Sequence, residues 1–329
     1  MNRTLLVSTF GAILAAAPLL ASVDGVVING TTGKPQPDTI VSLAQPGQGG
    51  MMVLKSVKTD ATGKYVLAQD VQGPQLVQVL YQGVLYNRMV PPGMPTSGVN
   101  VSVFESTNKA GVAKVSQHYI VLQPGDTELT VSEGILYVGD SKITYNDPVN
   151  GTMRFYVPAG AKAPGMVTVN TSGGMPVQRP ATPTKQPNVY KVDYPIRPGE
   201  TRFDISYSMP AAKPQIFADK ILHSEGDSDL VIPSGVTLKG DDFELMGQEP
   251  KTQASIYKIK KANFQVELDG AGTLAPLGGA AAQDEDNGSP SIQEVNPRIY
   301  EKLYWILGVA FAILGLGSVL LYRSGSERA

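Results

Sequence analysis

The chain has 329 residues, of which 17% are charged, and its formal net charge is −2. Lys and Arg (27) do not exceed Asp and Glu (29), so nucleic-acid binding, which depends on cations that neutralise phosphates, is disfavoured. The chain has no cysteine and only two histidines, His118 and His223, which excludes thiol catalysis, disulfide frameworks and cysteine-based zinc or haem sites. Glycine (35) and proline (25) indicate a folded chain rich in turns.

The N-terminus has the features of a secretory signal. Arg3 precedes an apolar run from Leu5 to Leu20, and the small residues Ala21 and Ser22 follow it. We predict that residues 1–22 are a cleaved signal peptide. An uncleaved anchor is the alternative, because the apolar run is slightly long and a leucine stands three residues before the cleavage site. Either interpretation places the following residues outside the cytoplasm.

Residues 23–104 are predicted to form an all-β domain. Short runs rich in Val, Ile, Thr and Tyr alternate with turn residues at spacings of about 8 to 12 residues, a pattern typical of β-sandwiches and barrels. Two turns are explicit in the sequence, at residues 29–35 and 59–65, where Gly, Asp and Pro cluster. The predicted strands are residues 25–28, 39–43, 52–59, 64–68, 76–81, 84–88 and 99–104.

Five motifs in this region occur together in one order. They are Gly25-Val26-Val27, Thr32-Gly33-Lys34-Pro35, Val41-Ser42-Leu43, Thr59-Asp60 and Gly63-Lys64-Tyr65. In this order they resemble the carboxypeptidase regulatory-like domain family. The resemblance implies a seven-stranded, transthyretin-like sandwich of the carbohydrate-binding-like group, which serves as an accessory module without catalysis. The matching residues form turns, so the resemblance implies a fold and no binding site.

An internal repeat follows the joint at residues 105–112. Residues 124–132 match residues 198–206 at an offset of 74, and residues 155–160 match residues 230–235 at an offset of 75. The sequence therefore predicts tandem β-sandwich modules, with repeat units at 113–188 and 189–269. Two alternatives stay open: a coincidence between common β-turns, and two halves of one larger sandwich.

The rest of the chain is predicted to connect and anchor these modules. Proline-rich residues 176–187 indicate a linker or exposed loop, and residues 270–297 a flexible tether. Residues 303–322 carry no charge and make a helix of about 30 Å, long enough to cross a bilayer. We predict one transmembrane helix there, with residues 323–329 as a cytoplasmic tail.

No catalytic constellation is evident. Val121 stands where a zinc carboxypeptidase His-x-x-Glu motif beginning at His118 needs Glu. The stretch from His223 to Asp229 has donors for a metal, with Asp227 and Asp229 as hard ligands, but an acidic solvated loop has the same composition. Residues 284–288 do not follow a calcium-loop pattern. We therefore predict no enzyme activity, and no catalytic, cofactor-binding or metal-ligating residues.

The architecture predicts a non-enzymatic, membrane-tethered extracytoplasmic protein whose β modules bind a protein or assemble an envelope complex. The lack of cysteine in an exported chain favours a bacterial envelope, with the body periplasmic or at the cell surface. Carbohydrate binding is the alternative, since exposed aromatic rings stack on sugars. Candidate surfaces are two loops, at residues 47–52 and 85–95, and nine tyrosines: Tyr81, Tyr86, Tyr119, Tyr137, Tyr145, Tyr156, Tyr190, Tyr194 and Tyr207.

Overall fold

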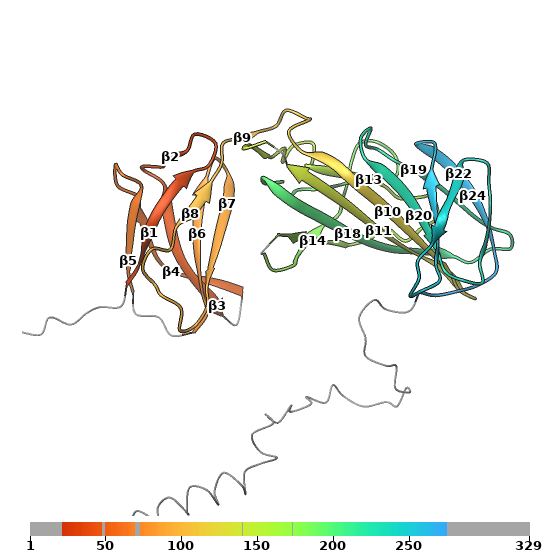
Figure 1. Ribbon diagram of the computed structural model, residues 1–329, viewed down its shortest axis with the longest axis horizontal. Helices are drawn as coiled ribbons and strands as arrows, with labels where there is room; N and C mark the ends of the chain where they lie inside the picture. Colours follow the sequence, from red (N-terminus) through yellow and green to blue (C-terminus); the bar gives the residue numbers. More distant parts are fainter. Residues whose placement is uncertain (1–21, 48–49, 70–72, 140, 173, 275–329) are drawn as a thin grey trace, which may run out of the picture. The chain divides into compact units, whose positions relative to one another are not determined.

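The computed structural model describes residues 22–47, 50–69, 73–139, 141–172 and 174–274. The predicted signal peptide, apart from Ser22, lies outside these ranges, as do most of the predicted tether, the transmembrane helix and the tail. Every secondary-structure element in the described ranges is a strand, as the predicted all-β fold requires (Figure 1). Within the same ranges, no helix is long and apolar enough to cross a membrane.

The first domain is a sandwich of two four-stranded sheets. In one sheet the order is β2-β1-β5, with β8 pairing parallel to β1, and in the other it is β4-β3-β6-β7. The strands are β1 (Ser22–Asn29), β2 (Lys34–Pro35), β3 (Ile40–Gly47), β4 (Gly50–Lys58), β5 (Lys64–Ala68), β6 (Gln75–Tyr81), β7 (Val84–Val90) and β8 (Val101–Val103).

Alternating side chains of both sheets make the core of this domain, as the period of two requires. Val27 from one sheet and Leu43 and Val79 from the other have no exposed surface. The predicted turns are confirmed: the Asp60 carboxylate accepts hydrogen bonds from the backbone N–H groups of Thr62 and Lys64, at 2.8 and 2.9 Å. All seven predicted strands are present, and the short β2 is an addition.

Residues 114–269 form a second, larger sandwich. The short β9 (Ser106–Thr107) lies between the two sandwiches in the sequence. The main sheet of the second sandwich has eight strands in the order β15-β14-β18-β11-β10-β20-β23-β22, and two three-stranded sheets, β13-β17-β16 and β19-β24-β21, share its core. The bounds are β10 (Lys114–Pro124), β11 (Glu128–Gly139), β12 (Thr144–Tyr145), β13 (Met153–Tyr156), β14 (Met166–Thr171), β15 (Val177–Pro180), β16 (Thr182–Pro183), β17 (Val189–Val192), β18 (Gly199–Pro210), β19 (Gln215–Lys220), β20 (Asp227–Ile232), β21 (Thr237–Lys239), β22 (Phe243–Gln248), β23 (Ser255–Ile259) and β24 (Asn263–Asp269).

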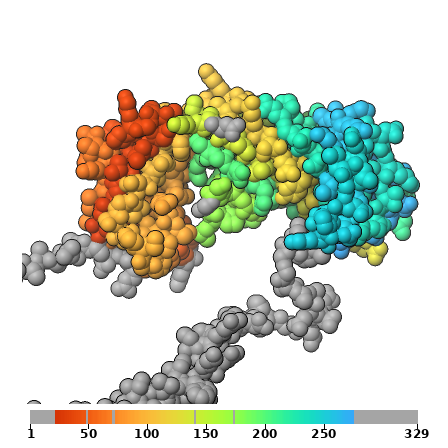
Figure 2. All heavy atoms as spheres, in the orientation of Figure 1, coloured from red at the N-terminus to blue at the C-terminus, as the bar shows by residue number. Residues whose placement is uncertain are grey.

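The prediction of separate repeat units at 113–188 and 189–269 is wrong, because strands of both belong to this one sheet. β11 of the first unit pairs antiparallel with β18 of the second along their full lengths, and β10 pairs parallel with β20. Buried residues of both halves form one hydrophobic cluster, and Figure 2 shows the yellow, green and cyan atoms as one continuous body. The physical reason is that strands of the two halves alternate within one sheet, so neither half forms a complete sheet of its own.

The matching turns have different roles in this single sandwich. Gly125 lies in the hairpin between β10 and β11, whereas Gly199 begins β18 at the opposite end of the β11–β18 pair. The second pair of turns is equivalent, since Gly160 and Gly235 have φ values of 86° and 88°. The predicted linker at 176–187 instead supplies the edge strand β15 and the short β16, where proline is tolerated.

Candidate functional site

The outer face of the sheet β4-β3-β6-β7 carries a row of exposed aliphatic side chains. Ile40 on β3 is opposite Leu80 on β6, and Leu80 is opposite Leu85 on β7. Their exposed fractions are 44%, 50% and 40%, values usual for polar strand positions that face solvent. Cross-strand neighbours lie about 5 Å apart, so these three side chains form one continuous apolar strip.

A second apolar row crosses the same face one polar row away. Met89 on β7 is opposite Leu76 on β6, and Val53 on β4 lies at the other end of the row, opposite the small residue Ala44. Val53 and Met89 are 54% and 47% exposed. The rows are four residues apart along the strand, which is about 13 Å. Met51 and Met52, in the predicted loop at 47–52, are exposed at the end of β4 beside this row.

The polar row between the two apolar rows is hydrogen-bonded within itself. The Ser42 and Ser56 hydroxyls lie 2.8 Å apart, and the Gln78 amide donates to Asn87 Oδ1 at 3.3 Å. A molecule that covers this row therefore leaves fewer polar groups without a hydrogen-bond partner than it would if the four side chains were unpaired. We call the three rows together the apolar outer face.

The tyrosines are distributed differently from this face. None of the tyrosines in the described ranges is exposed: Tyr86, Tyr194 and Tyr207 are buried, and the other predicted candidates are half-buried. The three rows of the apolar outer face contain no aromatic residue. The nine tyrosines thus do not form an exposed aromatic row on which a sugar ring stacks.

The second sandwich holds a cluster of titratable groups in its core. His118 on β10, Glu133 on β11, Tyr207 on β18 and Asp219 on β19 are each less than a tenth exposed. The Tyr207 hydroxyl donates to Oε1 of Glu133 at 2.7 Å. The second Glu133 oxygen, Oε2, lies 3.4 Å from Nε2 of His118, too long for a well-formed hydrogen bond. Buried ionisable groups are rare unless they have a structural or functional role.

Burial shifts the proton affinities of these groups strongly. It raises the pKa of Glu133 to about 7, although the hydrogen bond from Tyr207 acts in the opposite direction. Burial also raises the pKa of Asp219 well above its usual range, and the charge of Glu133 adds to the effect. The pKa of His118 falls to about 4, because burial disfavours its cation. All three shifts favour the neutral form of each group, as expected in a medium of low dielectric constant.

The cluster reaches the surface through the second histidine. Nδ1 of His118 lies 3.0 Å from Nε2 of His223, and Nδ1 of His223 lies 2.6 Å from the Glu225 backbone oxygen. His223 lines a cleft of about 410 Å³ together with Lys114, Tyr137, Arg154 and Glu225. The burial of its ring and the neighbouring His118 lower the pKa of His223. A chain of polar contacts therefore leads from the buried Glu133 to a surface cleft.

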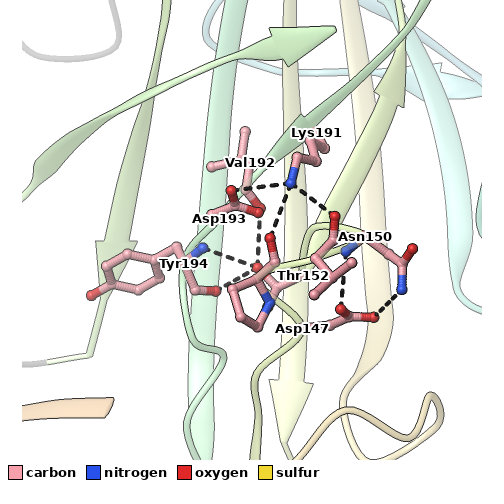
Figure 3. Close-up of polar contacts among 9 residues, drawn as sticks. Asp147, Asn150, Thr152, Lys191, Val192, Asp193 and Tyr194 are labelled. Atoms are coloured by element: carbon pink, nitrogen blue, oxygen red, sulfur yellow. Dashed lines mark hydrogen bonds and ion pairs between the residues drawn. The ribbon is translucent and has the colours of Figure 1, made fainter. Parts of the chain in front are cut away.

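A compact polar network holds the loop that carries Thr152, one of the residues that line this cleft (Figure 3). The Thr152 hydroxyl lies 2.6 Å from the Tyr194 backbone oxygen and accepts from the Tyr194 N–H at 3.1 Å. Lys191 donates to the Pro148 and Val149 backbone oxygens, both at 3.0 Å. These bonds hold the loop before β13 against β17 and the residues that follow it, and Gly151 and Thr152 of this loop line the cleft.

The structure does not bring together the possible metal ligands in the stretch from His223 to Asp229. His223 turns toward His118, while Asp227 begins β20 and its carboxylate accepts from Lys258 Nζ at 2.7 Å. No group of three or more acidic or histidine side chains in the described ranges is arranged to hold a metal ion. The geometry thus gives the His223–Asp229 stretch two other roles, a contact with the buried cluster and a surface ion pair.

The buried cluster was missed at the sequence level, although the sequence contains a signal for it. Leu129 and Val131 alternate with polar residues as core-facing strand positions do, and the strand period of two carries that face on to Glu133. In the same way, Phe203 and Ile205 lead to Tyr207. A charged or hydroxyl-bearing residue at a core-facing position indicates a buried polar contact.

Comparison with known proteins adds no family to this geometry. No protein-family model matches the chain, and no curated protein shows significant sequence similarity to it.

Proposed function

We propose that this chain is a non-enzymatic, membrane-tethered extracytoplasmic protein whose first sandwich binds a protein partner through the apolar outer face. The observation that supports this most is the pair of apolar rows, Ile40–Leu80–Leu85 and Val53–Leu76–Met89, on one side of a sheet. Exposed apolar residues that are gathered in rows on one sheet face, instead of being scattered singly, are typical of interaction surfaces.

The chemistry of the face defines the kind of partner. Lys58 is the one charged residue in the three rows, it stands at the end of the first row, and it is paired with Asp38 at 2.8 Å. The partner therefore presents an uncharged apolar surface, such as a sheet face or an amphipathic helix. The exposed methionines beside Val53 provide flexible thioether side chains that adapt to such a surface.

The glycan-binding alternative has less support. Sugar sites combine an exposed aromatic ring with polar groups, whereas the apolar outer face has no ring and its polar row is already hydrogen-bonded. The carboxypeptidase regulatory-like resemblance is compatible with either ligand, because it rests on turn residues alone.

The tethered location of this face is proposed from the sequence. The predicted signal at residues 1–22 and the apolar stretch at 303–322 support a body outside the cytoplasm on a single span, in a bacterial envelope. The nearly balanced charge of the chain does not favour nucleic acid or an anionic membrane surface as the ligand of the body.

A photo-crosslinking amino acid at position 80 tests the proposal in the native membrane. The matched control places the same probe at position 66, because Val66 is 58% exposed on β5, in the other sheet of the same sandwich. We expect a distinct protein to be crosslinked from position 80 only, and the product to disappear when Ile40→Asp is added. Equal products from both positions, or a product that persists with Ile40→Asp, would contradict the proposal. Crosslinking to a second copy of this chain would replace it with self-association.

A further inference from the structure

The hydrogen bonds around the two histidines determine which nitrogen atoms carry protons. A backbone oxygen only accepts, so Nδ1 of His223 carries the hydrogen that it donates to Glu225 at 2.6 Å. In a neutral His223, Nε2 is then an acceptor. His118 must therefore donate from its own Nδ1, at 3.0 Å. Both rings are thus the Nδ1–H tautomer, and the lone pair on Nε2 of His118 faces Glu133.

The contact between His118 and Glu133 accommodates a single hydrogen. Nε2 of His118 and Oε2 of Glu133 are 3.4 Å apart, and a hydrogen on each atom would bring two positive ends together. The other Glu133 oxygen accepts from Tyr207, so when this carboxyl is protonated its hydrogen lies on Oε2. Each hydrogen bond of the chain from His118 through His223 to the Glu225 oxygen therefore contains one hydrogen.

Cations lie near the surface end of this chain, where Lys114 and Arg154 line the cleft together with His223. The titratable groups around its buried end are Tyr207 from β18 and Asp219 from β19, and those that line the cleft with His223 are Lys114, Tyr137, Tyr145, Arg154 and Glu225. In the described ranges, no lysine or arginine forms an ion pair with Glu133 or Asp219. Lys114 pairs with Glu225 at 3.7 Å, but both side chains are more than half exposed and the pair is screened.

We infer that the His118–His223 contact is an acid-sensitive latch, which holds residues 222–225 against the cleft until a proton enters at Nε2 of His223. That nitrogen is the acceptor in the contact, and it belongs to the ring nearest the surface. Once it carries a hydrogen, two N–H groups face each other across 3.0 Å and the contact must break. The additional charge is then best accommodated by moving His223 into water.

The latched segment is anchored at both ends, which confines the movement. The Ile221 N–H donates to the Ala262 backbone oxygen at 2.7 Å. Gly226 has a φ of 84°, and a Cβ at this position would lie 2.4 Å from the Val115 backbone oxygen, so its backbone packs directly on β10. Between these anchors, residues 222–225 line the cleft, as do Gly151 and Thr152 of the loop before β13. Release of the latch therefore widens the cleft without unfolding the sandwich.

The sign of the pH dependence follows from the lowered pKa of His223. The closed latch is fully formed above the ordinary histidine pKa of about 6.5, and it is lost as the pH falls through the lower value in the folded protein. The proton enters at His223 because this ring lines the cleft, whereas the His118 ring is buried.

Two measurements on the full-length chain test the latch. The chain has two histidines, so ¹⁵N-labelled histidine gives signals from only two rings in long-range proton–nitrogen NMR spectra. We expect both rings to be Nδ1–H tautomers at neutral pH, and His223 to gain its second proton below the usual range. Hydrogen exchange of residues 222–225, corrected for its intrinsic pH dependence, should become at least about tenfold faster when His223 is protonated, which corresponds to about 1.4 kcal/mol of lost protection.

Two substitutions distinguish the latch from a general effect of acid. His223→Gln keeps an acceptor oxygen for Nδ1 of His118 but takes up no proton, so its exchange should stay slow in acid. Glu225→Gln, the matched control, keeps the backbone oxygen and should behave like the unmodified chain. An Nε2–H tautomer for His223, or acid-induced exchange that is the same in His223→Gln, would overturn the inference. If His223→Gln does not fold, the tautomers and titration of the unmodified chain decide the question.

Discussion

The ring of Tyr119 lies directly over Gly134, the residue opposite it on the neighbouring strand of the eight-stranded sheet. A Cβ atom built at position 134 would lie 2.0 Å from the ring carbon Cζ of Tyr119. The hydroxyl of Tyr119 donates to Asp204 on β18 at 3.2 Å, so the ring crosses β11 to reach its partner. Only glycine leaves room for this arrangement, in which an aromatic ring covers a glycine within a sheet.

Gly134→Ala should therefore destabilise the second sandwich. The new methyl group displaces the Tyr119 ring and breaks its hydrogen bond, at a cost of about 1–3 kcal/mol in the free energy of unfolding. Urea denaturation measures this change. Gly165→Ala is the control, because a Cβ at that position meets nothing within 4 Å. An equal effect of the two substitutions would show that the ring does not occupy this position.

Tyr207→Phe should weaken the same domain through the buried cluster. It removes the 2.7 Å hydrogen bond to Glu133 and leaves a buried carboxyl oxygen without that donor, which costs about 1–3 kcal/mol. Denaturation of the variant and of Tyr257→Phe should differ by this amount, since no hydrogen bond to the Tyr257 hydroxyl is formed within the described ranges. A loss no greater than in the control would mean that the Glu133–Tyr207 bond adds nothing to stability.

Glu133→Gln should reduce the loss of stability that the second sandwich shows as the pH rises. Burial raises the pKa of Glu133 from 4.5 to about 7. The contribution of this carboxyl to stability is therefore complete below about pH 4.5 and is lost as the pH rises through about 7. Glutamine does not ionise, so the free energy of unfolding should fall less between about pH 5 and pH 8 than in the unmodified chain. Glu128→Gln, at an exposed position, should leave the fall unchanged, and a fall in Glu133→Gln equal to this control would contradict the shift.

The two equivalent turns provide a test of the single sandwich. Gly160→Val and Gly235→Val each place a β-branched residue at a positive φ, which costs about 1–3 kcal/mol. Because both positions belong to one core, either substitution should lower the same unfolding transition of residues 114–269. Calorimetry in which each substitution shifted a different transition would restore two independent units.

The fold of the first domain could be predicted in detail because its strands are paired locally and its turns carry explicit chemistry. The Asp60 and Gly63 turn is one example, since the residue types themselves specify the backbone. The second sandwich could not be divided correctly, because residues 124–132 and 198–206 reveal a strand after a turn but not the strand with which it pairs. Pairing between β11 and β18 depends on which core faces complete each other in three dimensions.

The residues of the candidate sites also differ in how far the sequence predicts their positions. Alternation places Glu133 and Tyr207 on the core side of their strands, so their burial was predictable from the pattern around Leu129 and Phe203. The contact between His118 and His223 was not, because it joins positions 105 residues apart through a parallel β10–β20 pairing. The apolar outer face likewise depends on the register of β3, β6 and β7, which brings Ile40, Leu80 and Leu85 into one row.

The central claim is that the apolar outer face binds a protein, and the most direct test is the dissociation constant of the partner captured from position 80. Leu80→Asp places a charge in the middle of the first apolar row, and should weaken binding at least about tenfold, or 1.4 kcal/mol. Val66→Asp adds the same charge to the other sheet of the sandwich and should leave the constant unchanged. Unchanged affinity in Leu80→Asp, or equal weakening by both substitutions, would contradict the claim.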